Sequence, residues 1–263
     1  ANPISSQLSV MRSTLVPGLA ANLVTNRNRQ QDRVRVFEIG RCFERKADGE
    51  PVAGFHQPLR IAALAAGDAL PEQWGERGRK TDFYDLKGDL EALFAPLRLH
   101  FERVSHPALH PGRAAAVLLD GRRIGVLGEL HPVWVQRYEL GTAPVVFEVE
   151  LEDALAARLP GYVEISRMPA VVRDLALVVG QDVTVARVLE VLKAAAPAVV
   201  REITLFDVYQ GKGIEPDRKS LAFRVSMQDT QRTLGEVEVE SAVAALVREA
   251  EIALGARLRG SGE

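Results

Sequence analysis

An aspartate and a tyrosine lie two residues apart in a stretch that has the pattern of a β-hairpin. In residues 205–225, two arms of alternating, β-favouring residues flank a centre rich in glycine, proline and charge. If Phe206 and Val208 face a core, Asp207 and Tyr209 face outward together. A ring and a carboxylate on an open sheet face can hold an unstacked base, the ring by stacking and the carboxylate by accepting from its donors. An ordinary hairpin with a surface tyrosine explains the same pattern, and these residues alone favour it.

Histidines and aspartates elsewhere have the residue types of a metal centre but not its spacing. His106, His110 and His131 each precede a proline, which favours an extended backbone and disfavours a helical pair of ligands at i and i+4. We interpret them as turn residues. The sequence contains no HExxH arrangement, G-x-S-x-G elbow, P-loop or dinucleotide fingerprint. The other metal candidates, interpreted as a helix cap, a first-turn acid and a solvated face, are Asp82, Asp85 and Asp89.

Residues 1 to about 158 have the pattern of one α+β unit. Ser13 or Thr14 is expected to cap the first helix, with Pro17 in its first turn. Asp120-Gly121 is the strongest signal for a tight hairpin turn. The predicted helices start after 14, after 81 or 82, at 132 and at 151, and the predicted strands are 34–43 with Val34, Val36 and Ile39 inward, 59–66, 97–104, 114–119, 123–127 and 145–151.

Pro160-Gly161 is the predicted domain boundary, and the pattern beyond it is β-α-β-β-α-β. This order is the ferredoxin-like motif, in which two helices cover one face of an antiparallel sheet. The other face stays open, and many such domains bind RNA there. Asp182 or Thr184 is expected to cap the first helix, Thr233 to cap the second, and Gly255 to end it. The predicted elements are 171–179, 182–196, 199–210, 219–228, 233–254 and 256–259.

The composition is that of an ordinary soluble globular chain. It has 263 residues, 47% of them hydrophobic and 26% charged, which fits one or two domains. No apolar run approaches the roughly 20 residues of a membrane helix, and no signal peptide is recognised. The single cysteine, Cys42, excludes an internal disulfide framework, and we expect a cytoplasmic location. With a net charge of −2, any RNA contact must depend on local lysines and arginines.

Several segments of the second half form a specific set. They are 166–179 (SRMPAVVRDLALVV), 205–212 (LFDVYQGK), 219–223 (KSLAF), 228–229 (QD) and 232–234 (RTL). This set resembles the C-terminal anticodon-binding domain of the bacterial phenylalanyl-tRNA synthetase β subunit. The resemblance implies a ferredoxin-like β-α-β-β-α-β anticodon-binding domain over residues 161–263.

The first half carries a second set of matching segments: 2–5 (NPIS), 11–19 (MRSTLVPGL), 37–41 (FEIGR), 110–113 (HPGR) and 125–132 (GVLGELHP). These resemble the module that precedes the anticodon-binding domain in the same subunit. The implied fold class is therefore α+β, with a class II synthetase catalytic-like but inactive antiparallel sheet module over residues 1–160. Since the family's β subunit is much longer, we expect the chain to be its C-terminal third, without the N-terminal editing, RNA-contacting and metal-binding modules.

The glycine segment of the first half lacks the cation that adenylate chemistry needs. Active class II modules carry Glu-Arg after a glycine-rich segment, because charge develops on the ATP phosphates in the transition state. Here Gly125 and Gly128 are followed by Glu129-Leu130-His131. The resemblance therefore implies an inactive module that packs on the catalytic α subunit of an α2β2 heterotetramer, with a second β subunit. ATP and magnesium are used by the holoenzyme and not bound here, and Arg12 and Arg113 are expected to form structural ion pairs.

The resemblance assigns roles to residues of the second domain. Asp207, Tyr209 and Ser220 would hold the first anticodon base of tRNA-Phe. Tyr209 would stack on the base, Asp207 would accept from donors on its pairing edge, as suits guanine, and Ser220 would bond base or sugar. Stacking contributes about 1–3 kcal/mol per base. Candidates for phosphate contacts are Lys212, Arg218, Lys219, Arg224, Arg257 and Arg259.

Two other functions compete with this one. The chain can be a protein–protein interaction scaffold without useful RNA affinity of its own, which the net charge of −2 slightly favours. It can also be a self-sufficient enzyme, which the missing arginine disfavours. No membrane and no DNA partner are expected in any case.

Overall fold

The computed structural model describes residues 9–49, 51–152 and 165–260. Contacts divide the chain into two compact units, Ala1–Leu159 and Pro160–Glu263. The predicted boundary at Pro160-Gly161, the matching segment 2–5 and the part of the predicted helix 151–159 beyond residue 152 lie outside the described residues. No helix within the described ranges is both long enough and apolar enough to span a membrane.

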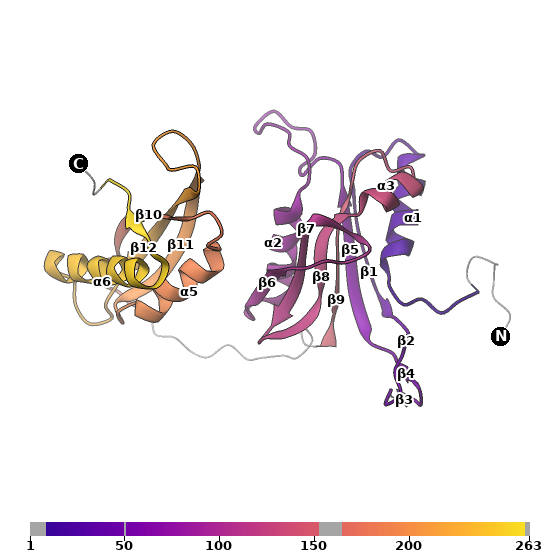
Figure 1. Cartoon of the computed structure of the whole chain (residues 1–263), viewed down its shortest axis with the longest axis horizontal. Helices are drawn as coiled ribbons and strands as arrows, with labels where there is room; N and C mark the ends of the chain where they lie inside the picture. Colours follow the sequence, from indigo (N-terminus) through magenta and orange to yellow (C-terminus); the bar gives the residue numbers. More distant parts are fainter. Residues whose placement is uncertain (1–8, 50, 153–164, 261–263) are drawn as a thin grey trace. The chain divides into compact units, whose positions relative to one another are not determined.

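The first unit is built on an antiparallel sheet with helices on both faces. Helices α1 (Val16–Arg27) and α3 (Pro132–Arg137) lie on one face, and α2 (Phe83–Phe94) lies on the other (Figure 1). A small second sheet has the order β2 (Glu44–Arg45), β4 (Phe55–His56), β3 (Pro51–Val52). The main sheet has the order β1 (Val34–Arg41), β5 (Leu59–Ala66), β9 (Val145–Glu150), β8 (Arg122–Leu130), β7 (Leu109–Leu119), β6 (Leu99–Arg103).

Burial on both faces explains why β5 is apolar along its length. Ala62 and Leu64 belong to the core beneath α1, while Ile61 and Ala65 belong to the core beneath α2. A strand covered on both sides has no polar face, so its sequence is a continuous apolar run. The predicted strand over 59–66 is confirmed.

The outer end of the α2 face is left uncovered. Helix α2 packs on β8 and β9, and it reaches the near end of β1 through the ion pair of Asp89 with Arg35. Phe37 and Ile39 point to this face and are 69% and 50% exposed. The expectation that Ile39 faces inward is wrong, because alternation places it opposite to Val34 and Val36, which pack beneath α1.

Helix α1 begins without the predicted side-chain cap. Its N-cap is Leu15, which makes no side-chain cap, and the Thr14 hydroxyl, one residue earlier, accepts from the Val16 N–H at 3.3 Å. Instead, the Glu148 carboxylate of β9 accepts from the Leu15 backbone N–H at 2.6 Å and from the Thr14 hydroxyl at 3.0 Å. A carboxylate from a distant strand and the Thr14 hydroxyl thus share the helix start, so the predicted contribution of Thr14 is borne out one residue before the N-cap, and that of Ser13 is not. Pro17 lies in the first turn, as predicted.

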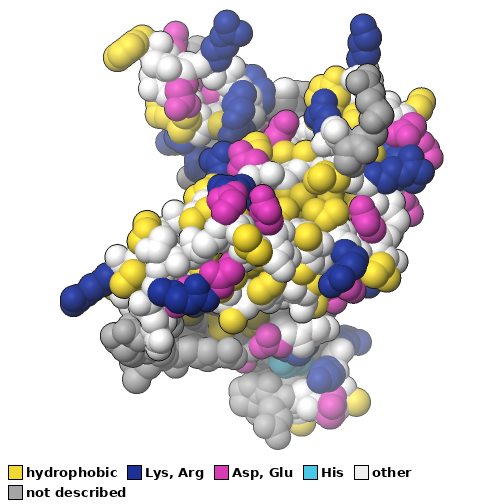
Figure 2. Space-filling view, turned by 90° about the vertical axis from the view of Figure 1, so that its left-hand side faces the viewer, with side chains coloured by type: hydrophobic (Ala, Val, Ile, Leu, Met, Phe, Trp, Pro, Cys, Tyr) yellow, Lys and Arg dark blue, Asp and Glu magenta, His cyan; other side chains and the backbone are white. Residues whose placement is uncertain are grey.

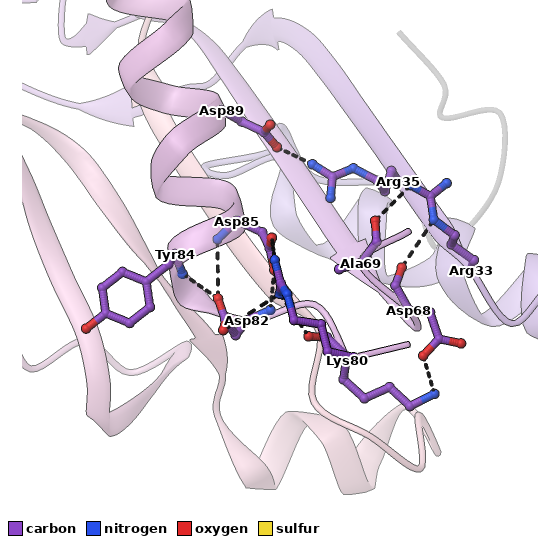
Figure 3. Close-up of polar contacts among 10 residues, drawn as sticks. Arg33, Arg35, Asp68, Ala69, Lys80, Asp82, Tyr84, Asp85 and Asp89 are labelled. Atoms are coloured by element: carbon purple, nitrogen blue, oxygen red, sulfur yellow. Dashed lines mark hydrogen bonds and ion pairs between the residues drawn. The ribbon is translucent and has the colours of Figure 1, made fainter. Parts of the chain in front are cut away.

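Helix α2 begins at the predicted Asp82. Its carboxylate accepts from two backbone N–H groups of the first turn, at 2.8 and 3.3 Å, while Asp85 accepts from the Asp82 N–H at 2.8 Å (Figure 3). Asp85 also pairs with Arg79 at 2.6 Å, and Asp89 pairs with Arg35. The interpretation of these aspartates as a cap, a first-turn acid and a surface charge is confirmed.

Each of the three histidines before a proline accepts a local backbone hydrogen bond. The Nδ1 atoms of His106, His110 and His131 accept from the N–H two residues later, at 3.3, 3.1 and 3.1 Å. The interpretation as turn residues holds for His106, whose carbonyl oxygen accepts from the Leu109 N–H at 3.0 Å. It is wrong for His110, which lies within β7, and His131 is the N-cap of α3. Within the described ranges, no group of three His, Cys, Asp or Glu side chains is arranged to hold a metal ion.

The hairpin predicted at Asp120-Gly121 joins β7 and β8. Both residues have positive φ, 49° and 78°, which is the backbone of the tight turn that this dipeptide favours. Both strands extend further than the alternation indicated, since β7 begins at Leu109 and β8 ends at Leu130.

The second unit has the predicted ferredoxin-like topology. Helices α5 (Val185–Ala195) and α6 (Glu236–Leu254) lie on one face of its antiparallel sheet (Figure 1). The core between helices and sheet includes Leu177, Phe223 and Leu246. The predicted α+β class, an antiparallel sheet module followed by a β-α-β-β-α-β domain, is confirmed. The strand order is β11 (Val200–Tyr209), β12 (Arg218–Met227), β10 (Val171–Gly180), β13 (Arg257–Leu258).

The two helices of this unit are capped in different ways. Thr184 caps α5, because its hydroxyl accepts from the Arg187 backbone N–H. Of the two predicted caps, Asp182 and Thr184, the second is therefore confirmed. The prediction that Thr233 caps α6 is wrong: the N-cap is Gly235, and its N–H donates to the Glu238 carboxylate at 3.2 Å. Gly255, at φ 59°, ends α6 as predicted.

Candidate nucleic-acid interface

Strand register brings the predicted trio together on the face away from the helices. Residues paired across antiparallel strands point to the same side. Tyr209 pairs with Ser220, and Asp207 pairs with Ala222, one row further along the same face. Leu221, between them on β12, points to the opposite side and is fully buried in the core. Asp207, Tyr209 and Ser220 therefore share the open face.

A β-bulge at Phe206 changes the alternation expected for β11. Leu205 packs against the core, and the register shifts between Leu205 and Asp207, so Phe206 is the extra residue. Phe206 is 50% exposed, and the prediction that it faces a core is wrong because the bulge interrupts the period of two. Val208 pairs with Leu221 and so points to the helix side of the sheet, but it is 50% exposed and does not belong to the core, so the prediction that it faces a core is also wrong.

Ser220 and Asp207 retain hydrogen-bonding capacity toward this face. Ser220 is 2% exposed and is the buried polar residue of the described chain. Its hydroxyl makes no hydrogen bond to any other described side chain, and neither does the exposed Asp207 carboxylate. The serine hydroxyl and the aspartate carboxylate are therefore both able to form hydrogen bonds with a ligand on this face.

Tyr209 is anchored to the hairpin loop. Its hydroxyl donates to the Lys212 carbonyl oxygen at 3.1 Å. A Cβ added to Gly211, whose φ is 152°, would lie 3.0 Å from the tyrosine hydroxyl oxygen, so glycine allows this close approach. The guanidinium carbon of Arg259 lies 4.8 Å from the ring centre, within the range of a cation–π contact. The hydroxyl contact thus fixes the Tyr209 ring, and the Arg259 guanidinium lies over it.

The basic residues expected near phosphates differ in what they contact. Basic and acidic side chains are interspersed on the face seen in Figure 2, in keeping with the net charge of −2. Four of the six have a carboxylate or carbonyl partner, and the other two make no ion pair with a described carboxylate. The first four are Arg224 (Asp174, 2.9 Å), Arg257 (Glu215, 3.7 Å), Arg218 (Gly255 carbonyl, 3.3 Å) and Lys219 (Gln181 carbonyl, 2.9 Å), and the other two are Lys212 and Arg259.

Arg60 of the first unit is held by two glutamates. Arg60, whose side chain is 17% exposed, pairs with Glu44 and with Glu148 at 3.4 Å. Cys42, fully buried, has a raised thiol pKa because of burial and then of the nearby Glu148 charge. An arginine already neutralised by two carboxylates has little charge to offer an anionic ligand.

The predicted ion pairs of Arg12 and Arg113 are confirmed. Arg12 pairs with Glu38, and Arg113 pairs with Glu129 at 2.7 Å. Glu129 directly follows Gly128. In an active class II module an arginine would come after this glutamate, whereas the next residue here is Leu130. These residues do not fit a nucleotide triphosphate, because each cation is matched by a carboxylate that would repel the phosphates.

Family models match both units. The model described as "Phenylalanyl tRNA synthetase beta chain CLM domain" matches residues 1–151, and "Ferredoxin-fold anticodon binding domain" matches residues 166–259. The chain is 73% identical over 260 residues to the phenylalanine–tRNA ligase beta subunit of Aromatoleum aromaticum, covering 99% of this chain and 33% of that protein. It is 58% identical over 259 residues to that of Dechloromonas aromatica, covering 98% and 33%. The chain thus spans about a third of these relatives' length.

A more distant likeness comes from solved structures. A pyrrolysyl-tRNA synthetase of Desulfitobacterium hafniense aligns with 55% of this chain and 47% of its own, with 16% identity and a TM-score of 0.39.

Proposed function

Because the chain belongs to the phenylalanyl-tRNA synthetase beta chain family, we propose that it binds the anticodon of tRNA-Phe as a non-catalytic part of a phenylalanine–tRNA ligase. The observation that carries this proposal is the placement of Asp207, Tyr209 and Ser220 on one open sheet face. A stacking ring, an acceptor and a hydroxyl there have the chemistry that single-stranded RNA recognition uses.

Each residue of the trio has a separate role toward the first anticodon base. Tyr209, held by the Lys212 carbonyl, presents its ring for stacking. Asp207 accepts hydrogen bonds from the pairing edge of guanine, whose N–H groups are donors. Ser220 satisfies its hydroxyl on the base or the sugar. Arg259 and Lys212, which have no described carboxylate partner, supply positive charge for the adjoining phosphates.

The first unit serves as a structural partner of the catalytic α subunit. Arg12, Arg60 and Arg113 are committed to glutamates, so we assign this unit no adenylate chemistry, and ATP and magnesium act in the holoenzyme. Phe37 and Ile39 give it an exposed apolar strip on which another subunit can pack. An α2β2 assembly with a second β subunit, located in the cytoplasm, completes the proposal.

Titration of the 263-residue chain with tRNA-Phe tests the RNA function. We expect Tyr209→Ala to weaken binding at least about tenfold, because stacking on the ring is lost. The control is Ile252→Ala, which removes a 73% exposed apolar side chain from α6, on the helix side of the sheet. Equal affinities of Tyr209→Ala and the parent chain would contradict the stacking role.

Gel filtration with the α subunit separates this function from that of a protein scaffold. The proposal predicts that the chain co-elutes with the α subunit and that tRNA-Phe joins the complex. If the chain co-elutes with the α subunit but never increases retention of tRNA, the scaffold function is favoured instead.

A further inference from the structure

Phe206 is an exposed aromatic residue that the trio does not use. It is the extra residue of the bulge in β11, and half of its surface is exposed. Leu205 before it is in contact with the core, and Asp207 after it pairs on the open face. Bulges re-aim side chains and are common beside functional sites. Here the bulge brings a ring to the same face as Asp207 without disturbing the core.

The Phe206 ring is paired with an arginine that is itself fixed. The guanidinium carbon of Arg224 lies 5.0 Å from the ring centre. Arg224 donates from two nitrogens to both carboxylate oxygens of Asp174, at 2.9 and 3.0 Å, across β12 and β10. This contact keeps the pKa of Asp174 below its usual value. Two donors on two acceptors fix the plane of the guanidinium, so the pair is ordered before any ligand arrives.

The arrangement repeats that of Tyr209 and Arg259 on the same face. In both cases an arginine lies over the ring of an aromatic residue of β11. Arg224 comes from β12, and Arg259 follows β13. Arg224 lies four residues from Ser220 along β12, or roughly 13 Å at about 3.3 Å per residue. Ala222 lies between them on this face, so no large side chain of β12 separates the two pairs.

We propose that Phe206 and Arg224 form a second stacking site, which takes another unstacked base of the RNA loop held at Tyr209. This inference rests on the proposed anticodon function. Aromatic rings and guanidinium planes are the surfaces on which proteins stack splayed bases, and they accept any base. Because Arg224 is neutralised by Asp174, its contribution is a planar surface, and phosphate attraction is left to other residues.

The test uses a tRNA-Phe anticodon stem-loop in which 2-aminopurine replaces, one at a time, an anticodon base other than the first. Stacking on an aromatic plane quenches the fluorescence of this base. With the parent chain we expect quenching at one of these positions. Phe206→Leu keeps apolar area but removes the ring, and it should abolish the quenching and weaken binding about tenfold. Arg224→Lys keeps the charge but loses the plane, and it should also reduce the quenching.

Three results would overturn the proposal, and they differ in what else they affect. If Phe206→Leu binds and quenches like the parent while Tyr209→Ala weakens binding, the second site is wrong and the anticodon function stands. If neither variant changes RNA affinity, both proposals fail. If Phe206→Leu weakens co-elution with the α subunit at unchanged RNA affinity, the ring belongs to a protein contact. Ile252→Ala serves as the control for loss of an exposed apolar side chain, and thermal melting confirms that each variant is folded.

Discussion

Arg259 lies over the ring of Tyr209, with 4.8 Å between the guanidinium carbon and the ring centre, although the two residues come from opposite edges of the sheet. Tyr209 ends β11, and Arg259 follows β13. Ser220 and Val178 occupy the two strands between these edges in the row of Tyr209. Their small or short side chains leave room for a ring and a guanidinium to meet above them.

This contact predicts a change in the salt dependence of RNA binding. Arg259→Ala should weaken tRNA-Phe binding by about threefold to tenfold and lower the slope of log affinity against log salt by about one. The reason is that a guanidinium beside a base stacked on Tyr209 would neutralise an adjoining phosphate. Arg248→Ala, an exposed arginine on α6, is the matched control and should leave the slope unchanged. Tighter binding by Arg259→Ala would mean that the arginine only blocks the ring.

Substitution of Ser220 should weaken tRNA-Phe binding without a matching loss of stability. Ser220→Ala removes the buried hydroxyl that has no described partner, so we expect the melting temperature to stay within a few degrees of the parent. Binding of tRNA-Phe should weaken by about threefold to tenfold, the value of one hydrogen bond. Ser226→Ala, six residues from Ser220 along the same strand, is the control for RNA binding. A fall in stability without loss of affinity would assign Ser220 to the fold alone.

Asp85 predicts a pH-dependent stability of the first unit. The hydrogen bond from Arg79 lowers its pKa from 3.8 to about 2. A depressed carboxyl pKa contributes stability above the unfolded pKa, and that contribution is lost as pH falls through the folded one. Asp85→Asn should lower the free energy of unfolding by about 1 kcal/mol at pH 7, allowing for screening by solvent. The difference should shrink between pH 4 and pH 2.

Denaturant unfolding followed by tryptophan fluorescence measures this difference, because Trp74 and Trp134 both lie in the first unit. Asp89→Asn is the control, since its pair with Arg35 is more exposed and should change stability by less than about 0.5 kcal/mol. An Asp85→Asn effect that persists undiminished at pH 2 would contradict the assignment.

Cys42 predicts a thiol without reactivity in the folded chain. It is fully buried, and burial raises its pKa, so the thiolate that reacts with disulfide reagents is scarce. As the single cysteine of the chain, it gives an unambiguous signal. Ellman's reagent should not react over an hour with the native chain and should react within minutes in denaturant. Rapid reaction of the native protein would show that this part of the sheet opens readily.

Local signals of the sequence predicted much of the fold. The apolar run of β5, the turn at Asp120-Gly121, the cap of α2 at Asp82 and the end of α6 at Gly255 each depend on residues close in the chain. The β-α-β-β-α-β order followed from their succession. Such features are predictable because period and turn chemistry act over a few residues.

Features that join distant segments were not predictable in the same way. At the start of α1, the Leu15 N–H donates to Glu148 of β9, which lies far away in the sequence. No residue close to Leu15 in the sequence indicates this partner. The bulge at Phe206 was missed because an alternating pattern assumes uninterrupted pairing with the next strand. Asp207 and Tyr209 still share a face as expected, since both lie after the bulge. The approach of Arg259 to Tyr209 depends on how the strands are ordered across the sheet, which no local pattern contains.

A two-by-two binding experiment tests whether Asp207 recognises the first anticodon base. The parent chain and Asp207→Asn are each titrated with tRNA-Phe and with a tRNA in which adenine replaces the first anticodon guanine. We expect the parent chain to bind the altered tRNA about tenfold or more weakly than tRNA-Phe, and Asp207→Asn to bind both tRNAs about equally. Undiminished discrimination by Asp207→Asn would contradict it, because the carboxylate would then have no part in selecting the base.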